Sequence, residues 1–91
     1  MFVLVELFGI PRQRAGQAVV KLEVCEKSTC LGNIVLQLAE LFPDLAEECF
    51  KGQQLQTGYV ASLGGKTFVR SPGTKVQAGE SLLIMSADSG G

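Results

Sequence analysis

The sequence contains no histidine. Histidine is the commonest general base in enzymes and the commonest metal ligand, so its absence removes the usual starting point for either kind of site. No other combination of side chains in the sequence suggests a nucleophile with its base. We therefore do not expect the chain to be an enzyme on its own.

Long apolar runs and clusters of basic residues are missing as well. No run approaches the roughly 18–20 apolar residues of a membrane-spanning helix, and the N-terminus lacks the basic segment that begins a signal peptide. Eight basic and nine acidic residues give a formal net charge of −1, without a basic patch that would attract nucleic acid. We therefore predict a cytoplasmic protein that binds neither membranes nor nucleic acid.

The three cysteines do not complete a metal site. Their odd number argues against a disulfide framework. The spacing of Cys25 and Cys30 matches the start of the plant-type ferredoxin motif, but that motif needs a third cysteine where Asn33 stands and a fourth further on. A structural zinc site needs four ligands. No metal is expected, and we interpret these cysteines, with Cys49, as small apolar side chains.

Apolar residues, in contrast, make up 46% of the 91 residues, and charged residues only 19%. A chain of this length forms one domain and can bury enough surface to fold without metals or disulfides. The composition excludes disorder of the whole chain. We predict one folded domain over residues 1–86 and a flexible tail over residues 87–91.

Two stretches with strand periodicity open the chain. In residues 2–8, aliphatic side chains alternate with Phe2, Leu4 and Phe8, which share the other face. Alternation resumes over residues 17–26, and the stretch between them, with its glycines and proline, predicts an irregular polar connection. Together they predict a β-hairpin whose aliphatic face is turned to the core.

A helical pattern replaces the strand pattern after Cys30. Its apolar stripe consists of Leu31, Ile34, Val35, Leu38 and Leu41 or Phe42. Ser28 or Thr29 is the predicted N-cap, and Pro43 should end the helix because proline disfavours the α conformation of the residue before it. A second, short helix is predicted over residues 44–50.

Three further strands are predicted, over residues 58–63, 66–70 and 81–86. Gly64-Gly65 indicates a hairpin turn between the first two. Pro72-Gly73 is a second turn, and residues 76–80 are expected to be a loop. The order β-β-α-β-β-β predicts an α+β protein of the β-grasp (ubiquitin-like) class. In this class one main helix covers one face of a mixed four- to five-stranded sheet. Periodicity alone also permits other small α+β arrangements.

Several motifs resemble those of the ubiquitin-like sulfur-carrier family. The first is the opening strand at residues 3–9 with the loop at 12–16. The second is the helix that starts at Thr29-Cys30-Leu31-Gly32 and ends at Phe42-Pro43. The others are Ala78-Gly79-Glu80 before the last strand and the final Gly90-Gly91. The small sulfur-carrier subunit of molybdopterin synthase is the most similar branch, and the thiamine-pathway sulfur carrier is more distant. Ser86-Ala87-Asp88-Ser89 replaces the prolines and apolar residue that often precede the glycines in the synthase branch, which leaves the pathway open.

The resemblance implies that the reactive group is the α-carboxylate of Gly91. In this family an adenylating, E1-like enzyme activates the terminal glycine with ATP, and a sulfur donor such as a cysteine desulfurase system then provides the sulfur of a thiocarboxylate. Gly90, Ser89 and Asp88 would lead this group into the large subunit of molybdopterin synthase. The carrier itself is expected to bind no cofactor.

A partner surface is predicted on the sheet. Phe2, Leu4 and Phe8 are apolar residues on the face opposite the aliphatic set, and residues 82–85 are apolar on both faces. Since large exposed apolar areas often mark interfaces, we predict that Leu82 and Ile84 join this surface. Packing at the edge of the sheet is an equally good explanation of Phe2, Leu4 and Phe8.

Three other functions use the same features. A carrier for thiamine or another sulfur pathway would share the terminus and differ in its partner. A ubiquitin-like modifier would join Gly91 to lysines of target proteins. A non-covalent β-grasp interaction module would not use Gly91 at all.

Overall fold

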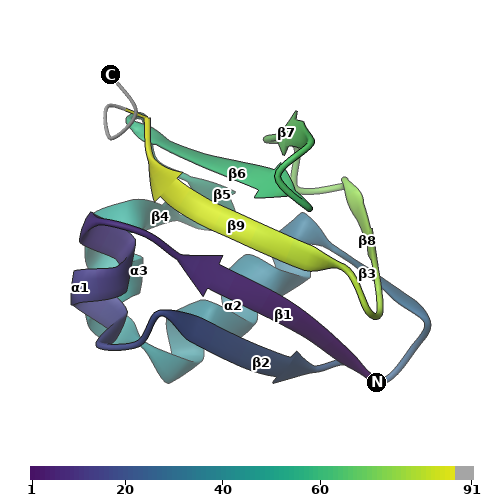
Figure 1. The fold of residues 1–91 in the computed structure, drawn as a ribbon. Coiled ribbons are helices and arrows are strands. Elements are labelled where there is room, and N and C mark those ends of the chain that lie inside the picture. Colours follow the sequence, from purple (N-terminus) through teal and green to yellow (C-terminus); the bar gives the residue numbers. More distant parts are fainter. Residues whose placement is uncertain (88–91) are drawn as a thin grey trace.

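The structure, a computed structural model, describes residues 1–87 (Figure 1). Its elements in chain order are β1 (Phe2–Leu7), α1 (Ile10–Ala15), β2 (Val19–Glu23), β3 (Ser28–Cys30), α2 (Leu31–Leu41), α3 (Pro43–Cys49), β4 (Phe50–Lys51), β5 (Gln54–Leu55), β6 (Tyr59–Leu63), β7 (Thr67–Val69), β8 (Lys75–Gln77) and β9 (Ser81–Ser86). Within residues 1–87, none of the helices has the length and apolar character needed to cross a membrane.

Five strands form one mixed sheet in the order β2-β1-β9-β6-β7. β1 and β9 are parallel, and the other neighbours are antiparallel. The first and last strands therefore lie side by side in the middle of the sheet, with α2 behind it (Figure 1). This arrangement confirms the predicted α+β class and the β-grasp fold.

The core lies between the sheet and α2. Val3, Val5 and Ala61 from the sheet are fully buried, as is the apolar stripe of α2 from Leu31 to Leu38. The exposed positions of β1 alternate with the buried ones, as the aliphatic pattern predicts. α2 ends at Leu41 and α3 begins at Pro43, which confirms proline as the end of the main helix.

The connection between β1 and β2 is a helix, and the prediction of an irregular loop there is wrong. Gly9 precedes α1 with a φ of 63°, and Gly16 follows it with a φ of 75° in the left-handed helical conformation. Glycine adopts positive φ values without steric cost. Pro11 lies in the first turn, where a missing N–H removes no helical hydrogen bond. Its side chain is buried, so tertiary packing stabilises a helix too short to form alone.

The start of α2 also differs from the prediction. Ser28 and Thr29 belong to β3, which pairs with β8 in a stretch expected to be a loop, and the N-cap position is Cys30. The first N–H groups of α2 are satisfied from a distance. Leu31 N–H donates to Thr74 O and Gly32 N–H donates to Pro72 O, both at 2.9 Å. The chain therefore needs no local capping side chain, and sequence periodicity gives no sign of this long-range cap.

Candidate functional site

The residues predicted to carry the chemistry, Gly91 and Gly90 with Ser89 and Asp88, lie outside the described residues. β9 ends at Ser86, and Ala87 is the last residue that the structure describes. The N–H of Ala87 donates a hydrogen bond to the carbonyl of Gly58 at 2.7 Å. The chain is thus held in the sheet up to the residue before the predicted reactive segment.

The end of β9 is enclosed by two other segments of the chain. On one side Phe8 N–H donates to Ile84 O at 3.0 Å, and α1 begins two residues later, at Ile10. On the other side lies the turn that contains Gly58, before β6. Phe8 and Ile10 are 44% and 40% exposed, so apolar side chains are available beside the point where the chain leaves the sheet.

A polar network joins three elements below this point. Arg14 of α1 forms an ion pair with Glu48 of α3, with 3.1 Å between Nη2 and Oε1. The hydroxyl of Tyr59, on β6, donates to the other carboxylate oxygen of Glu48 at 2.8 Å. Tyr59 is also the β6 partner of Ser86 in the sheet. The network therefore links α1 and α3 to the strand that neighbours the end of β9.

Burial shifts the titration of two groups here. Burial, with a smaller contribution from the charge of Glu48, raises the pKa of the Cys49 thiol to about 11. Burial, followed by the hydrogen bond to Glu48, raises the pKa of Tyr59 well above its ordinary value. At neutral pH both groups are protonated, and a buried thiol in that state is a poor nucleophile. Cys49 therefore behaves as the apolar side chain that the sequence suggests.

These shifts predict a loss of stability in alkali. Both groups hold their protons more tightly in the folded state, so the unfolded state ionises first and the free energy of unfolding falls as pH rises. For Cys49 the fall spans pH 9.0 to about 11. Tyr59→Phe should cost about 1 kcal/mol at neutral pH, the value of one hydrogen bond, and should make the alkaline fall shallower. Urea denaturation of the unchanged protein and of the variant at a series of pH values measures this. If the free energy of unfolding falls equally steeply with pH in both, Tyr59 does not cause the alkaline loss of stability.

The other two cysteines lie elsewhere. Cys25 is exposed in the segment after β2, and Cys30 is half-buried at the start of α2. Among residues 1–87 no three cysteine or carboxylate side chains gather into a possible metal-binding group.

Three of the five predicted partner residues lie on the surface. Phe2, Leu4 and Phe8 are 42%, 39% and 44% exposed on the side of the sheet opposite α2. Leu82 and Ile84 are 0% exposed, so the prediction that they bind a partner is wrong. The sheet register explains the difference. Leu82 pairs with Val5 and Ile84 with Ala61, both core residues, and β9 turns Leu83 and Met85 to the opposite side.

The surface opposite α2 is wider than the sequence suggests, and we call it the outer face. It comprises Phe2, Leu4, Phe8, Val19, Leu83, Met85 and Phe68. Pairing brings Val19 and Leu83 to either side of Glu6, and Ser62 lies between Leu83 and Phe68. Val19 and Phe68 are 50% and 74% exposed. Strand alternation around them was visible in the sequence, but only the sheet order shows that they share this face.

No protein-family model and no curated protein matches the sequence. Solved structures do match in three dimensions. Small archaeal modifier protein 1 from Haloferax volcanii has a TM-score of 0.80 at 21% identity, over 100% of both chains. A Pyrococcus furiosus protein assigned as subunit 1 of a molybdopterin converting factor has a TM-score of 0.77 at 19% identity, over 94% of this chain and 97% of that one.

Urm1 from Trypanosoma brucei is a third such neighbour, with a TM-score of 0.74 at 17% identity, over 99% of this chain and 95% of its own. At these identities the likeness concerns the fold. All three neighbours are ubiquitin-like proteins, and the chain shares with them, over nearly its whole length, the β-grasp fold.

Proposed function

We propose that the protein is a ubiquitin-like carrier that is activated at the carboxylate of Gly91. The observation that carries the proposal is the position of Gly90-Gly91. The pair ends a short segment that follows β9, the strand in the middle of a β-grasp sheet. The names of the structural neighbours support it, because they describe modifier proteins and a converting-factor subunit of the same size.

The chemistry proceeds through an acyl adenylate. A carboxylate is ionised at neutral pH and is a poor electrophile, so it must first be activated. The Gly91 carboxylate attacks the α-phosphorus of ATP in an E1-like enzyme and releases pyrophosphate. A persulfide sulfur from a cysteine desulfurase system then attacks the carbonyl carbon and displaces AMP. After a thiol has cleaved the sulfur–sulfur bond of this acyl persulfide, Gly91 carries a thiocarboxylate.

The residues between the sheet and Gly91 suit delivery into a partner. Four residues beyond Ala87 span at most about 14 Å when fully extended, enough to enter a pocket while the folded body stays outside. Glycine at positions 90 and 91 carries no Cβ that would obstruct a narrow channel.

The more specific proposal is sulfur delivery to molybdopterin. In it, the large subunit of molybdopterin synthase receives the Gly91 thiocarboxylate, and the sulfur passes to a pterin precursor. The sequence resemblance and the name of the Pyrococcus neighbour support this role. A thiamine-pathway or other sulfur carrier would use the same thiocarboxylate with a different acceptor.

A second candidate function is protein modification. Two Haloferax volcanii structures of small archaeal modifier protein 1 are among the neighbours, which favours an isopeptide bond between Gly91 and lysines of target proteins. Both candidates start from the same acyl adenylate and differ in the nucleophile that attacks it.

One experiment separates these functions. The purified protein is incubated with ATP, an E1-like enzyme and a sulfide donor, and its intact mass is measured. Tagged protein is also recovered from cells and examined for lysine adducts. Replacement of oxygen by sulfur supports the carrier, and adducts through Gly91 support the modifier. If neither product forms, the proposal of activation at Gly91 is wrong.

The outer face gives a further prediction for the activating partner. Phe68→Ser should change the free energy of unfolding by less than about 0.5 kcal/mol, because the side chain is 74% exposed. If the outer face docks on the E1-like enzyme, the same change should raise the KM for the carrier about ten-fold or more, as expected for an interface anchor. ATP–pyrophosphate exchange measures this KM. Leu36→Ser, at an exposed leucine of α2, is the matched control and should leave the KM unchanged.

A further inference from the structure

The free edge of β2 is a second candidate surface for a partner, and it adjoins the outer face at Val19. β2 is the terminal strand of the sheet and pairs only with β1 among the described residues. The bonds from Leu7 N–H to Ala18 O and from Val24 N–H to Met1 O show which residues of this region face β1. In an antiparallel ladder the alternate residues face away. The backbone groups of Val19, Lys21 and Glu23 are therefore turned to the open side.

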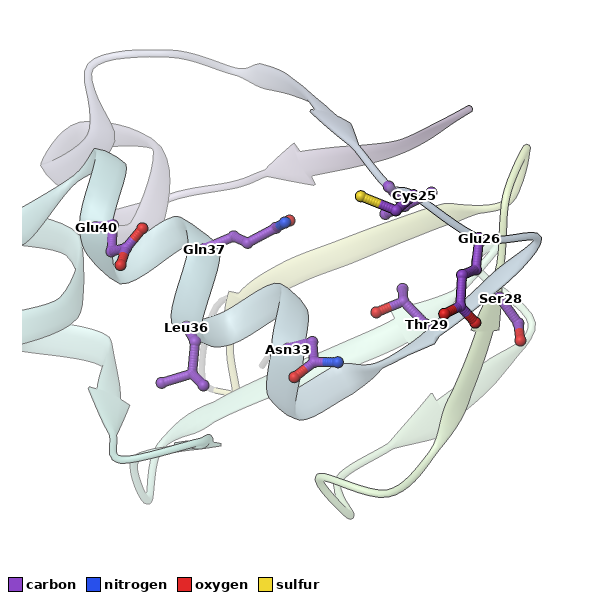
Figure 2. Close-up of a pocket in the computed structure, with 9 residues that line it drawn as sticks. Cys25, Glu26, Ser28, Thr29, Asn33, Leu36, Gln37 and Glu40 are labelled. Carbon is purple, nitrogen blue, oxygen red and sulfur yellow. The ribbon is translucent and has the colours of Figure 1, made fainter.

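A groove runs beside this edge, between β2 and α2. It consists of two hollows of about 380 and 260 Å³ that share Gln37 and Glu40 of α2. The larger hollow extends to Cys25 and Thr29, and the smaller one to Leu22 and Leu41. Figure 2 shows the larger hollow, in which Cys25 and Gln37 point toward each other across the gap. An extended segment paired with β2 would place alternate side chains into this groove.

The charges around the groove are mostly negative. Glu23, Glu26 and Glu40 line it and are exposed. Lys21 is its one basic lining residue within the described part of the chain, and the Lys21 ammonium lies 4.1 Å from the centroid of the Phe2 ring, toward the outer face. Carboxylates in this arrangement favour arginine or lysine side chains on the occupant.

Gln37 adds a hydrogen-bond acceptor that has no donor within the described residues. Its Oε1 atom is shielded from solvent and has no partner among residues 1–87. A shielded acceptor without a donor is unfavourable, and native structures normally satisfy such atoms. Rotation of the Gln37 side chain toward the groove would let Oε1 accept a hydrogen bond from an occupant.

We propose that the β2 edge and the β2–α2 groove bind an extended, basic segment of a partner protein as an additional antiparallel or parallel strand. The free N–H and C=O groups of Val19, Lys21 and Glu23 hold its backbone, and Glu40 and Glu26 receive its basic side chains. When a peptide adds a strand to the edge of a sheet, main-chain hydrogen bonds provide the affinity and side-chain contacts, here in the groove, provide the selectivity. The groove extends along β2 to Cys25, whereas the end of β9 lies beside Phe8 at the opposite end of β1. A partner bound here leaves the end of β9 uncovered.

The probe for this proposal is a short peptide in which arginine alternates with valine. Its control is the same peptide with glutamate in place of arginine. Binding is followed by fluorescence anisotropy and by the backbone amide signals of the protein. We expect the amides of Val19, Lys21 and Glu23 to shift and to exchange more slowly, and the arginine peptide to bind about five-fold or more tightly than the glutamate peptide.

Variants at Lys21 separate strand pairing from side-chain effects. Lys21→Pro removes an N–H that faces the open edge, where proline is tolerated in strands, and should weaken binding at least about five-fold. Lys21→Ala removes the same side chain, keeps the N–H and should bind normally. Thermal melting verifies that both are folded. Glu40→Gln should weaken binding about two- to five-fold, the effect of one exposed ion pair.

Four results would overturn the proposal. They are no binding of either peptide, equal binding of both, amide shifts confined to outer-face residues other than Val19, and equal binding by the two Lys21 variants. Sedimentation of the free protein tests another occupant. A dimer that Lys21→Pro abolishes would show that a second copy of the chain, and not a basic partner segment, pairs with β2.

Discussion

Removal of Gly91 is expected to abolish the ATP-dependent exchange of oxygen for sulfur at the end of the chain. The proposed adenylate forms on the Gly91 carboxylate, and without Gly91 the new terminal carboxylate lies one residue, about 3.5 Å, closer to the folded body. A displacement of that size exceeds what positioned chemistry tolerates, since about 1 Å can cost a hundred-fold in rate. Intact-mass measurement after reaction with ATP, an E1-like enzyme and sulfide detects the product.

Two further variants sharpen this test. Gly90→Ala keeps the length and adds one methyl group, so it should slow the reaction on the order of a hundred-fold if the partner's channel fits closely around the backbone. Ser89→Ala changes a side chain of similar size and serves as the control, with little effect expected. Full activity of the Gly91 deletion would exclude both the sulfur carrier and the modifier.

Ile84→Ala is expected to lower the free energy of unfolding by about 2–5 kcal/mol, because it opens a cavity at a fully buried position. Single domains are stable by only about 5–15 kcal/mol, so this one change removes a large part of the total. Urea denaturation, with the midpoint and the slope measured separately, gives the value. The loss arises in the core between β9 and α2.

Leu83→Ala is the matched control for that experiment. Leu83 precedes Ile84 on the same strand, has the same type of side chain and lies half-buried on the outer face. Its truncation should cost less than half as much, and any effect on partner binding should appear here and not at Ile84. Equal costs at the two positions would contradict the burial pattern of β9.

The difference between Leu83 and Ile84 shows which feature of the sheet the sequence could not predict. Alternation in residues 2–8 separates the two faces of β1 correctly, because polar Glu6 and the aromatic residues mark one of them. Residues 82–85 are all apolar, so period-two analysis has no polar position from which to set the faces. Only the parallel register with β1 and the antiparallel register with β6 place Leu82 and Ile84 in the core.

The other differences have the same origin. α1 forms because Pro11 packs against the fold and a glycine lies at each end of the helix. Its six residues are too few to show a helical pattern in the sequence. β3 and β8 are short strands that exist through pairing with each other. The N-terminus of α2 is capped by carbonyls of Pro72 and Thr74, about forty residues further along the chain. Each depends on a contact between distant segments.

The sequence by itself determined the element types of the main strands and of α2, their order along the chain and the position of Gly90-Gly91, because local periodicity, proline and glycine act over a few residues. The tertiary structure alone decided which residues form the outer face, how Tyr59, Glu48 and Arg14 meet below the end of β9, and that β2 presents an open edge beside an acidic groove. These features arise from strand order and register, which bring together residues that no local pattern relates.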